Sequence, residues 1–103
     1  MKPTIGRTVL FKVSHEIATE INRRRTKRAS IAERTATGEW PIGAQAHIGN
    51  DAKEGQEFPL VIVNVWSDTC VNGHVLLDGS DSYWATSVLL GDDEGQWHWP
   101  ERV

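Results

Sequence analysis

The sequence predicts a mainly β domain with short helices, built as a five-stranded SH3-like antiparallel barrel with a helical insertion after the first strand. Four β-like runs follow one another at residues 58–66, 71–77, 83–90 and 96–99. Asn-Gly, Asp-Gly and Gly-Asp signals, which mark turns, lie within and between these runs. Closing the sheet into a barrel would remove the exposed edges of so apolar a sheet. An open sheet with helices packed on one face is the competing architecture.

The first strand is expected within residues 4–13. Its alternation places four apolar side chains on one side of a strand, with Arg7 interrupting. These side chains are Ile5, Val9, Phe11 and Val13.

Residues 14–37 are expected to form the helical insertion. Ser14 offers an N-cap oxygen, and Glu16 lies in the first turn, where the helix dipole favours an acid. A narrow apolar stripe formed by Ile17, Ala18 and Ile21 predicts a short helix at 15–25 that lies on the sheet. A capping box at residues 30–33 predicts a second short helix at 31–36, which Gly38 ends.

A structured loop is expected at residues 38–57, before the main run of strands. Leu60–Val63 is apolar on both faces and indicates the central strand of the sheet. Asn72-Gly73 lies near the start of the next strand, although this dipeptide can also form a hairpin turn. Asp78–Asp81 is the clearer hairpin turn, and residues 91–95 form a solvated acidic loop.

Length and composition indicate one domain, residues 1–103, with its barrel core at 58–99. No apolar run approaches the roughly 20 residues that a membrane-spanning helix needs, and the N-terminus lacks a signal-peptide pattern. Cys70 is the only cysteine and cannot form an internal disulfide. We therefore expect a cytoplasmic protein without a membrane partner.

The net charge of −3 conceals a strong asymmetry along the chain. Up to Arg34 there are nine basic and three acidic residues, a net charge of +6, whereas the remainder has two basic and eleven acidic residues, a net charge of −9. The overall negative charge means that binding to duplex nucleic acid is not expected.

The densest charge feature is the arginine run, residues 23–28, with five cations in six positions. Guanidinium groups bind phosphate oxygens through two parallel hydrogen bonds, so the run suits a phosphate-bearing ligand. The alternative is a solvated helix end that the acidic half of the chain neutralises.

Tryptophan is unusually frequent, at five residues in 103. Trp66 and Trp84 lie where large rings would cap a small barrel. Trp97 and Trp99 share one strand face, so both belong to the core or both to the surface. Exposed indoles beside cations would suit base stacking or a peptide groove.

The sequence predicts no catalytic centre, metal site or cofactor. The four histidines are scattered without ligand spacing, and no motif supports a nucleophile beside a base. No glycine pattern resembles a phosphate-binding loop or a dinucleotide fingerprint. We therefore expect a binding protein and not an enzyme.

Four segments resemble a group of small bacteriophage proteins, and the similarity extends over most of the chain. They are Ile21–Thr26, Trp40–Asn50, Val65–Gly79 and Trp97–Glu101. The resemblance implies a phage gene product that acts in the cytoplasm of an infected bacterium. Small phage accessory proteins of this size frequently counter host defence, by sequestering nucleotide immune signals in the pockets of an oligomer or by occluding a host protein.

The leading hypothesis is an anti-defence protein that sequesters a phosphate-bearing nucleotide signal, as a possible homo-oligomer. Its phosphate-binding residues would be Arg23, Arg24, Arg25 and Lys27. The base would stack on Trp40, Trp97 or Trp99, and the base or ribose would bond to His47 and Asn50. The alternatives are a protein–protein adaptor for a host or virion protein and a single-stranded nucleic-acid binder.

Overall fold

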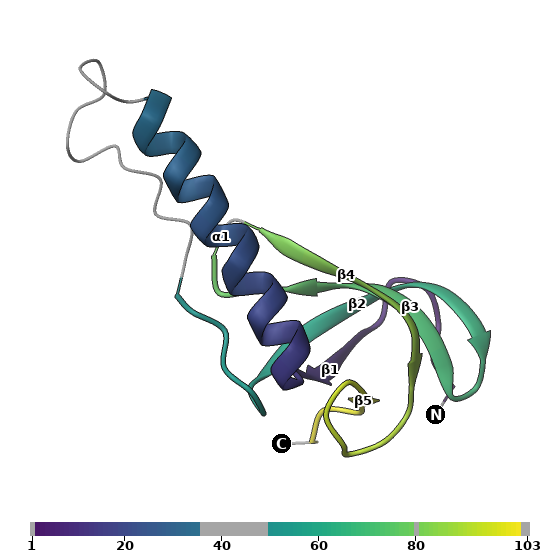
Figure 1. Cartoon of the computed structure of the whole chain (residues 1–103). Helices are drawn as coiled ribbons and strands as arrows, with labels where there is room; N and C mark the ends of the chain where they lie inside the picture. Colours follow the sequence, from purple (N-terminus) through teal and green to yellow (C-terminus); the bar gives the residue numbers. More distant parts are fainter. Residues whose placement is uncertain (1, 36–49, 80, 102–103) are drawn as a thin grey trace.

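The computed structural model describes residues 2–35, 50–79 and 81–101, with the backbone alone for 26–35. Its five antiparallel strands form one sheet, in the order β4-β3-β2-β1-β5, that curls into a half-barrel (Figure 1). The mainly β, five-stranded antiparallel fold class is therefore confirmed. In chain order the elements are β1 (Thr8–Lys12), α1 (His15–Thr35), β2 (Glu57–Ser67), β3 (Cys70–Leu76), β4 (Ser82–Leu89) and β5 (Trp97–His98).

The strands form where apolar residues alternate, and β2 is the central strand, as predicted. In β1, Val9 and Phe11 are buried and pair with Leu60 and Phe58 of β2, which are also buried. Successive side chains point to opposite faces of a strand, so these residues line the inner face of the curl. Ile5 precedes the strand and is 70% exposed, so its predicted place in the apolar stripe is wrong.

The two ends of the curled sheet approach each other beside Trp97. Phe11 pairs with Trp97 in β5, and Leu90, just past β4, forms a parallel bridge to the same residue. The Trp97 indole is fully buried and donates a hydrogen bond from Nε1 to the Thr69 carbonyl oxygen, at 3.2 Å. Trp99 packs edge-on against it, with ring centroids 5.3 Å apart, but it lies past the end of β5 and is only partly buried, so the prediction that both belong to one strand face in one environment holds only in part.

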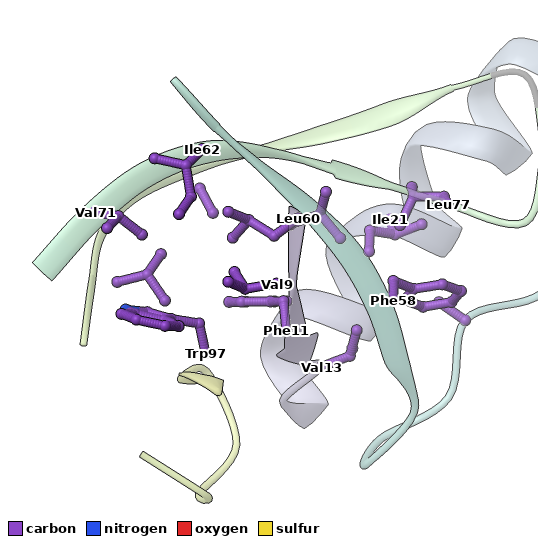
Figure 2. Close-up of a cluster of buried hydrophobic side chains, with 14 of the residues drawn as sticks. Val9, Phe11, Val13, Ile21, Phe58, Leu60, Ile62, Val71, Leu77 and Trp97 are labelled. Atoms are coloured by element: carbon purple, nitrogen blue, oxygen red, sulfur yellow. The ribbon is translucent and has the colours of Figure 1, made fainter. Parts of the chain in front are cut away.

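Helix α1 lies against the inner face of the half-barrel and completes the core. Its N-cap is Ser14, as predicted, because the hydroxyl oxygen accepts the Ile17 N–H at 3.2 Å. Ile21 is buried and lies beside Phe58 and Leu77 (Figure 2). The predicted stripe of Ile17, Ala18 and Ile21 therefore anchors the helix.

The prediction of two short helices is wrong, because the helical region is one continuous helix, His15–Thr35. Arginine, lysine and alanine are good helix formers, and no glycine or proline interrupts this stretch, so the arginine run continues the helix instead of ending it.

Asn72-Gly73 lies near the start of β3, as predicted, and does not form the hairpin turn that was its alternative. The hairpin turn follows Leu76, as the Asp78–Asp81 signal predicts.

Trp66 and Trp84 do not cap the barrel. Their side chains are 63% and 44% exposed, because they lie on the outer face of the sheet. The closed end of the half-barrel is filled by Trp97 instead. The predicted turn at Trp40–Gly43 and the helix end at Gly38 lie outside the described residues.

In the ranges that the structure describes, no helix combines the length and the apolar character needed to cross a membrane.

Candidate functional site

The arginine run divides into two differently placed groups. Arg23 and Arg24 are exposed, and both bond to Glu20, one helical turn earlier. The Arg23 Nη2 and Arg24 Nε atoms each lie 2.9 Å from Glu20 Oε1. Hydrogen bonds from Arg23 and then Arg24 lower the pKa of the Glu20 carboxyl. These two guanidiniums are exposed and paired.

Arg25 takes a structural role between the helix and the turn after β3. It is 6% exposed, and its Nε and Nη2 atoms donate to the two carboxylate oxygens of Asp81, at 3.0 and 2.8 Å. Its Nη1 atom donates to the Asn50 carbonyl oxygen. The hydrogen bond to Asp81 raises the pKa of Arg25. A buried guanidinium with these partners is not available to a phosphate.

The predicted hydrogen-bonding residue Asn50 belongs to the same structural network. Its Nδ2 atom donates to Asp78 Oδ2 at 2.8 Å, and its backbone N–H donates to the Asp78 carbonyl oxygen at 3.0 Å. The structure therefore brings Asn50 and Arg25 together, as the sequence grouped them, but in a junction that links helix, loop and turn.

Trp97 and Trp99, two of the three predicted stacking residues, lie near β5 and outside this junction. Trp97 is fully buried, so it has no free face for a base, and its assignment as a stacking residue is wrong. Trp99 is half-buried, and Arg7, outside the arginine run, lies over its ring with Cζ 5.3 Å from the centroid. Trp40, His47 and the side chain of Lys27 lie outside the described residues.

A different surface gathers the exposed aromatic side chains. Thr8, Val61, His74 and Trp84 form one row across β1 to β4, because each is the direct cross-strand partner of the next. Paired residues share a face, and this row points away from the core. We call the exposed side chains of this region the aromatic face, which comprises Val61, Val63, Trp66, His74, Leu76 and Trp84.

The rings of the aromatic face are held in place. His74 and Trp84 stack at a tilt, with centroids 4.8 Å apart. The Trp66 Nε1 atom donates to Asn72 Oδ1 at 3.0 Å, and the same oxygen accepts the Ser87 N–H at 2.7 Å. Because the indole N–H is satisfied within the chain, the Trp66 ring is oriented and still presents its face to solvent.

None of the six side chains of the aromatic face belongs to a lysine, arginine, aspartate or glutamate. Charged side chains follow farther along the same outward register, where Lys12 pairs with Glu57, and His98 Nε2 lies 3.4 Å from Glu57 Oε2. An exposed apolar surface with two fixed indoles is typical of a binding site.

Sequence reasoning missed this face because it assigned Trp66 and Trp84 to the core. One signal was present in the sequence. Leu60–Val63 is apolar at every position, and successive side chains of a strand point to opposite faces, so every second apolar residue of this segment must lie on the outer face. Leu76 on β3 and Trp84 on β4 point to the same outer face of the sheet.

Comparison of the chain with protein families, with curated proteins and with solved structures finds no match. Across residues 2–35, 50–79 and 81–101, no group of three histidine, cysteine, aspartate or glutamate side chains is placed to hold a metal ion.

Proposed function

We propose that this chain is a non-enzymatic phage accessory protein with an SH3-like scaffold that binds a partner protein through the aromatic face. The observation that carries the proposal is the exposure of Trp66 and Trp84 among apolar neighbours on the outer face of the sheet. Large exposed apolar areas on a small domain mark interaction sites, and tryptophan is the residue most enriched where binding energy concentrates.

The fixed geometry of the two indoles supports protein binding. A side chain that is already ordered loses little conformational entropy when a partner binds. Trp66 is ordered by Asn72, and Trp84 by its contact with His74. These rings act as rigid anchors around which Val63 and Leu76 supply aliphatic contact area.

The chemistry of the face defines the partner. No lysine, arginine, aspartate or glutamate belongs to the aromatic face, so the face offers a charged ligand no ion pair, and the Trp66 N–H is already bonded within the chain. What remains for the partner is the π-face of each indole and aliphatic carbon. The partner therefore presents a proline-rich or aliphatic segment, the kind that aromatic surfaces of small β domains accept.

Site-specific photo-crosslinking in phage-infected bacteria tests this proposal. A photoreactive residue is placed at Val63 or Leu76 on the aromatic face, and at Glu54, exposed in the turn before β2, as a matched control. The expected result is the same host or virion protein linked at positions 63 and 76, and not at 54. The adducts are expected to disappear when Trp66→Ala and Trp84→Ala are combined, with the fold retained because both rings are exposed.

Two results would contradict the proposal. Absence of any adduct at positions 63 and 76 throughout infection would show that nothing docks there. Equal labelling at 54, or adducts that survive loss of both tryptophans, would place the contact elsewhere.

Sequestration of a nucleotide signal stays a separate prediction, supported by the arginine run. The Arg23 and Arg24 side chains are exposed, and a phosphate can compete with Glu20 for them. Calorimetry against cyclic dinucleotides and ADP-ribose derivatives is expected to give heat that Arg23→Gln with Arg24→Gln abolishes. The absence of heat for every compound would remove the hypothesis. Binding of a single-stranded oligonucleotide would instead weaken steeply with added salt.

A further inference from the structure

The two edges of the sheet differ in how they are protected. At one edge, β5 has two residues and is soon followed by Pro100, which cannot donate to a ladder. At the other, β4 has eight residues, Ser82–Leu89, and in the described part of the chain its only strand neighbour is β3. Every second residue of such an edge strand turns its N–H and C=O groups outward.

Strand β4 lacks two of the devices that usually protect an edge, which are charged residues and proline. Its sequence, Ser-Tyr-Trp-Ala-Thr-Ser-Val-Leu, contains neither. The irregularity of the strand is a bulge near its C-terminal end, where Thr86 and Ser87, the latter with a φ of 51°, together lie opposite Asn72. Ser82–Ala85, before the bulge, pair regularly with β3. An uncharged strand rich in aromatic and β-branched residues readily pairs with another extended chain.

We propose that two copies of this chain form a symmetric dimer by antiparallel pairing of their β4 strands through Ser82–Thr86. The unpaired backbone groups define the occupant as an extended strand, and β4 itself supplies one. A symmetric pairing uses the same surface on both copies, which is the commonest arrangement among oligomers.

The side chains of this segment are self-complementary about Trp84. In an antiparallel pair centred there, Trp84 lies opposite its counterpart in the second copy. Tyr83 lies opposite Ala85, and Ser82 lies opposite Thr86. Aromatic pairs and hydroxyl pairs stabilise neighbouring strands, and a large ring beside a small methyl group avoids crowding.

The charged residues beside β4 do not oppose its pairing with the β4 strand of a second copy. Arg24 lies over the Tyr83 ring, with Cζ 5.8 Å from the centroid, and is bonded to Glu20. Arg25 is bonded to Asp81, which directly precedes β4. These cations are neutralised within each copy, so two identical edges approach without repulsion between like charges.

The dimer joins the two sheets into one, so that the two aromatic faces become continuous at Trp84. This inference does not depend on the proposed function, because β4 pairing requires no further partner.

Sedimentation velocity on charge variants tests the dimer. Ser82 and Thr86 are exposed, so substitutions there preserve the fold, which circular dichroism checks. The wild-type chain is expected to sediment at twice its 11.5 kDa mass. Ser82→Lys with Thr86→Lys places like charges opposite each other and is expected to give a monomer. Ser82→Lys with Thr86→Glu places opposite charges there and is expected to remain a dimer.

A wild-type chain that stays monomeric up to its solubility limit overturns the proposal, as does a dimer that persists in the double-lysine variant. A second measurement fixes the register. In a Cys70→Ser background, Trp84→Cys places two sulfur atoms within disulfide reach across the pair. It is expected to form a linked dimer under mild oxidation, while Leu76→Cys, exposed on β3 away from the edge, is not. Equal linkage of both variants overturns β4 pairing.

Discussion

At the scale of single residues, the helical period determines what each arginine of the run does. With 3.6 residues per turn, Arg23 and Arg24 lie three and four positions after Glu20 and reach it together. Arg25 lies a further 100° around the helix, faces the sheet and meets Asp81. Three neighbouring residues of one type therefore make two exposed pairs and one buried pair.

The buried pair makes a prediction about stability. Asp81→Asn leaves the Arg25 guanidinium buried without its counter-charge, which typically costs about 3 kcal/mol or more. We expect the free energy of unfolding, measured by urea denaturation, to fall by about 3 kcal/mol. The matched control is Glu20→Gln, which breaks an exposed pair and is expected to cost far less. Equal losses in the two variants would show that the Arg25–Asp81 pair has no special structural role.

The burial or exposure of an individual side chain could be predicted only where the alternation of a strand determines it. Val9, Phe11 and Val13 are in the core, as their spacing predicts. The five tryptophans were not separable by spacing, because an indole is large enough for a core and amphipathic enough for a surface. Trp97 and Trp66 differ in burial because the bulged end of β2 carries one ring outward while the curl encloses the other.

At the scale of elements, the strands and the start of the helix were predictable, and the C-terminal end of the helix was not. All four runs between residues 58 and 99 correspond to strands, because alternation and turn residues act locally. The capping box at residues 30–33 predicted the start of a second helix, but the same four residues are also compatible with the interior of one helix. The continuous helix forms because nothing between His15 and Thr35 stops it.

Strand β3 offers a second prediction, at Gly73. Next to Gly73, the pairing of β3 shifts register with both neighbouring strands, β2 and β4. The backbone of β2 lies close to Gly73. A Cβ atom there would lie 2.5 Å from the Val61 carbonyl oxygen and against the Leu60 side chain. We expect Gly73→Ala to lower the free energy of unfolding by about 2 kcal/mol, because packed strands absorb added volume poorly. Ser82→Ala, at an exposed strand position, is the control, and equal stability of the two variants in urea would contradict this account.

At the scale of the whole molecule, the half-barrel places its described tryptophans in two environments. Trp97 and Trp99 close the curl on the inside, whereas Trp66 and Trp84 are held on the outside. The sequence supported a small β domain with short connections, but it did not reveal which face of the sheet stays uncovered. That outcome depends on which face of the sheet α1 covers, whereas the apolar stripe of the helix predicts only that the helix lies on the sheet.

Within the part of the chain that the structure describes, the large charge asymmetry along the chain gives rise to little ion pairing between its basic and acidic halves. Among the described residues, one buried pair, Arg25–Asp81, joins the basic and acidic halves. The remaining described arginines of the run pair within the helix. The charge asymmetry therefore contributes one buried ion pair to the fold, between α1 and the residue that precedes β4.

The most direct test of the account is fluorine NMR of the chain labelled with 5-fluorotryptophan, with each of the five resonances assigned by a Trp→Phe variant. Extract from phage-infected cells and a panel of cyclic dinucleotides are added separately. We predict that the extract shifts or broadens the Trp66 and Trp84 resonances while the buried Trp97 resonance stays unchanged. Unchanged Trp66 and Trp84 signals, with Trp40 or Trp99 responding to a nucleotide, would contradict the proposal that the aromatic face is the binding surface.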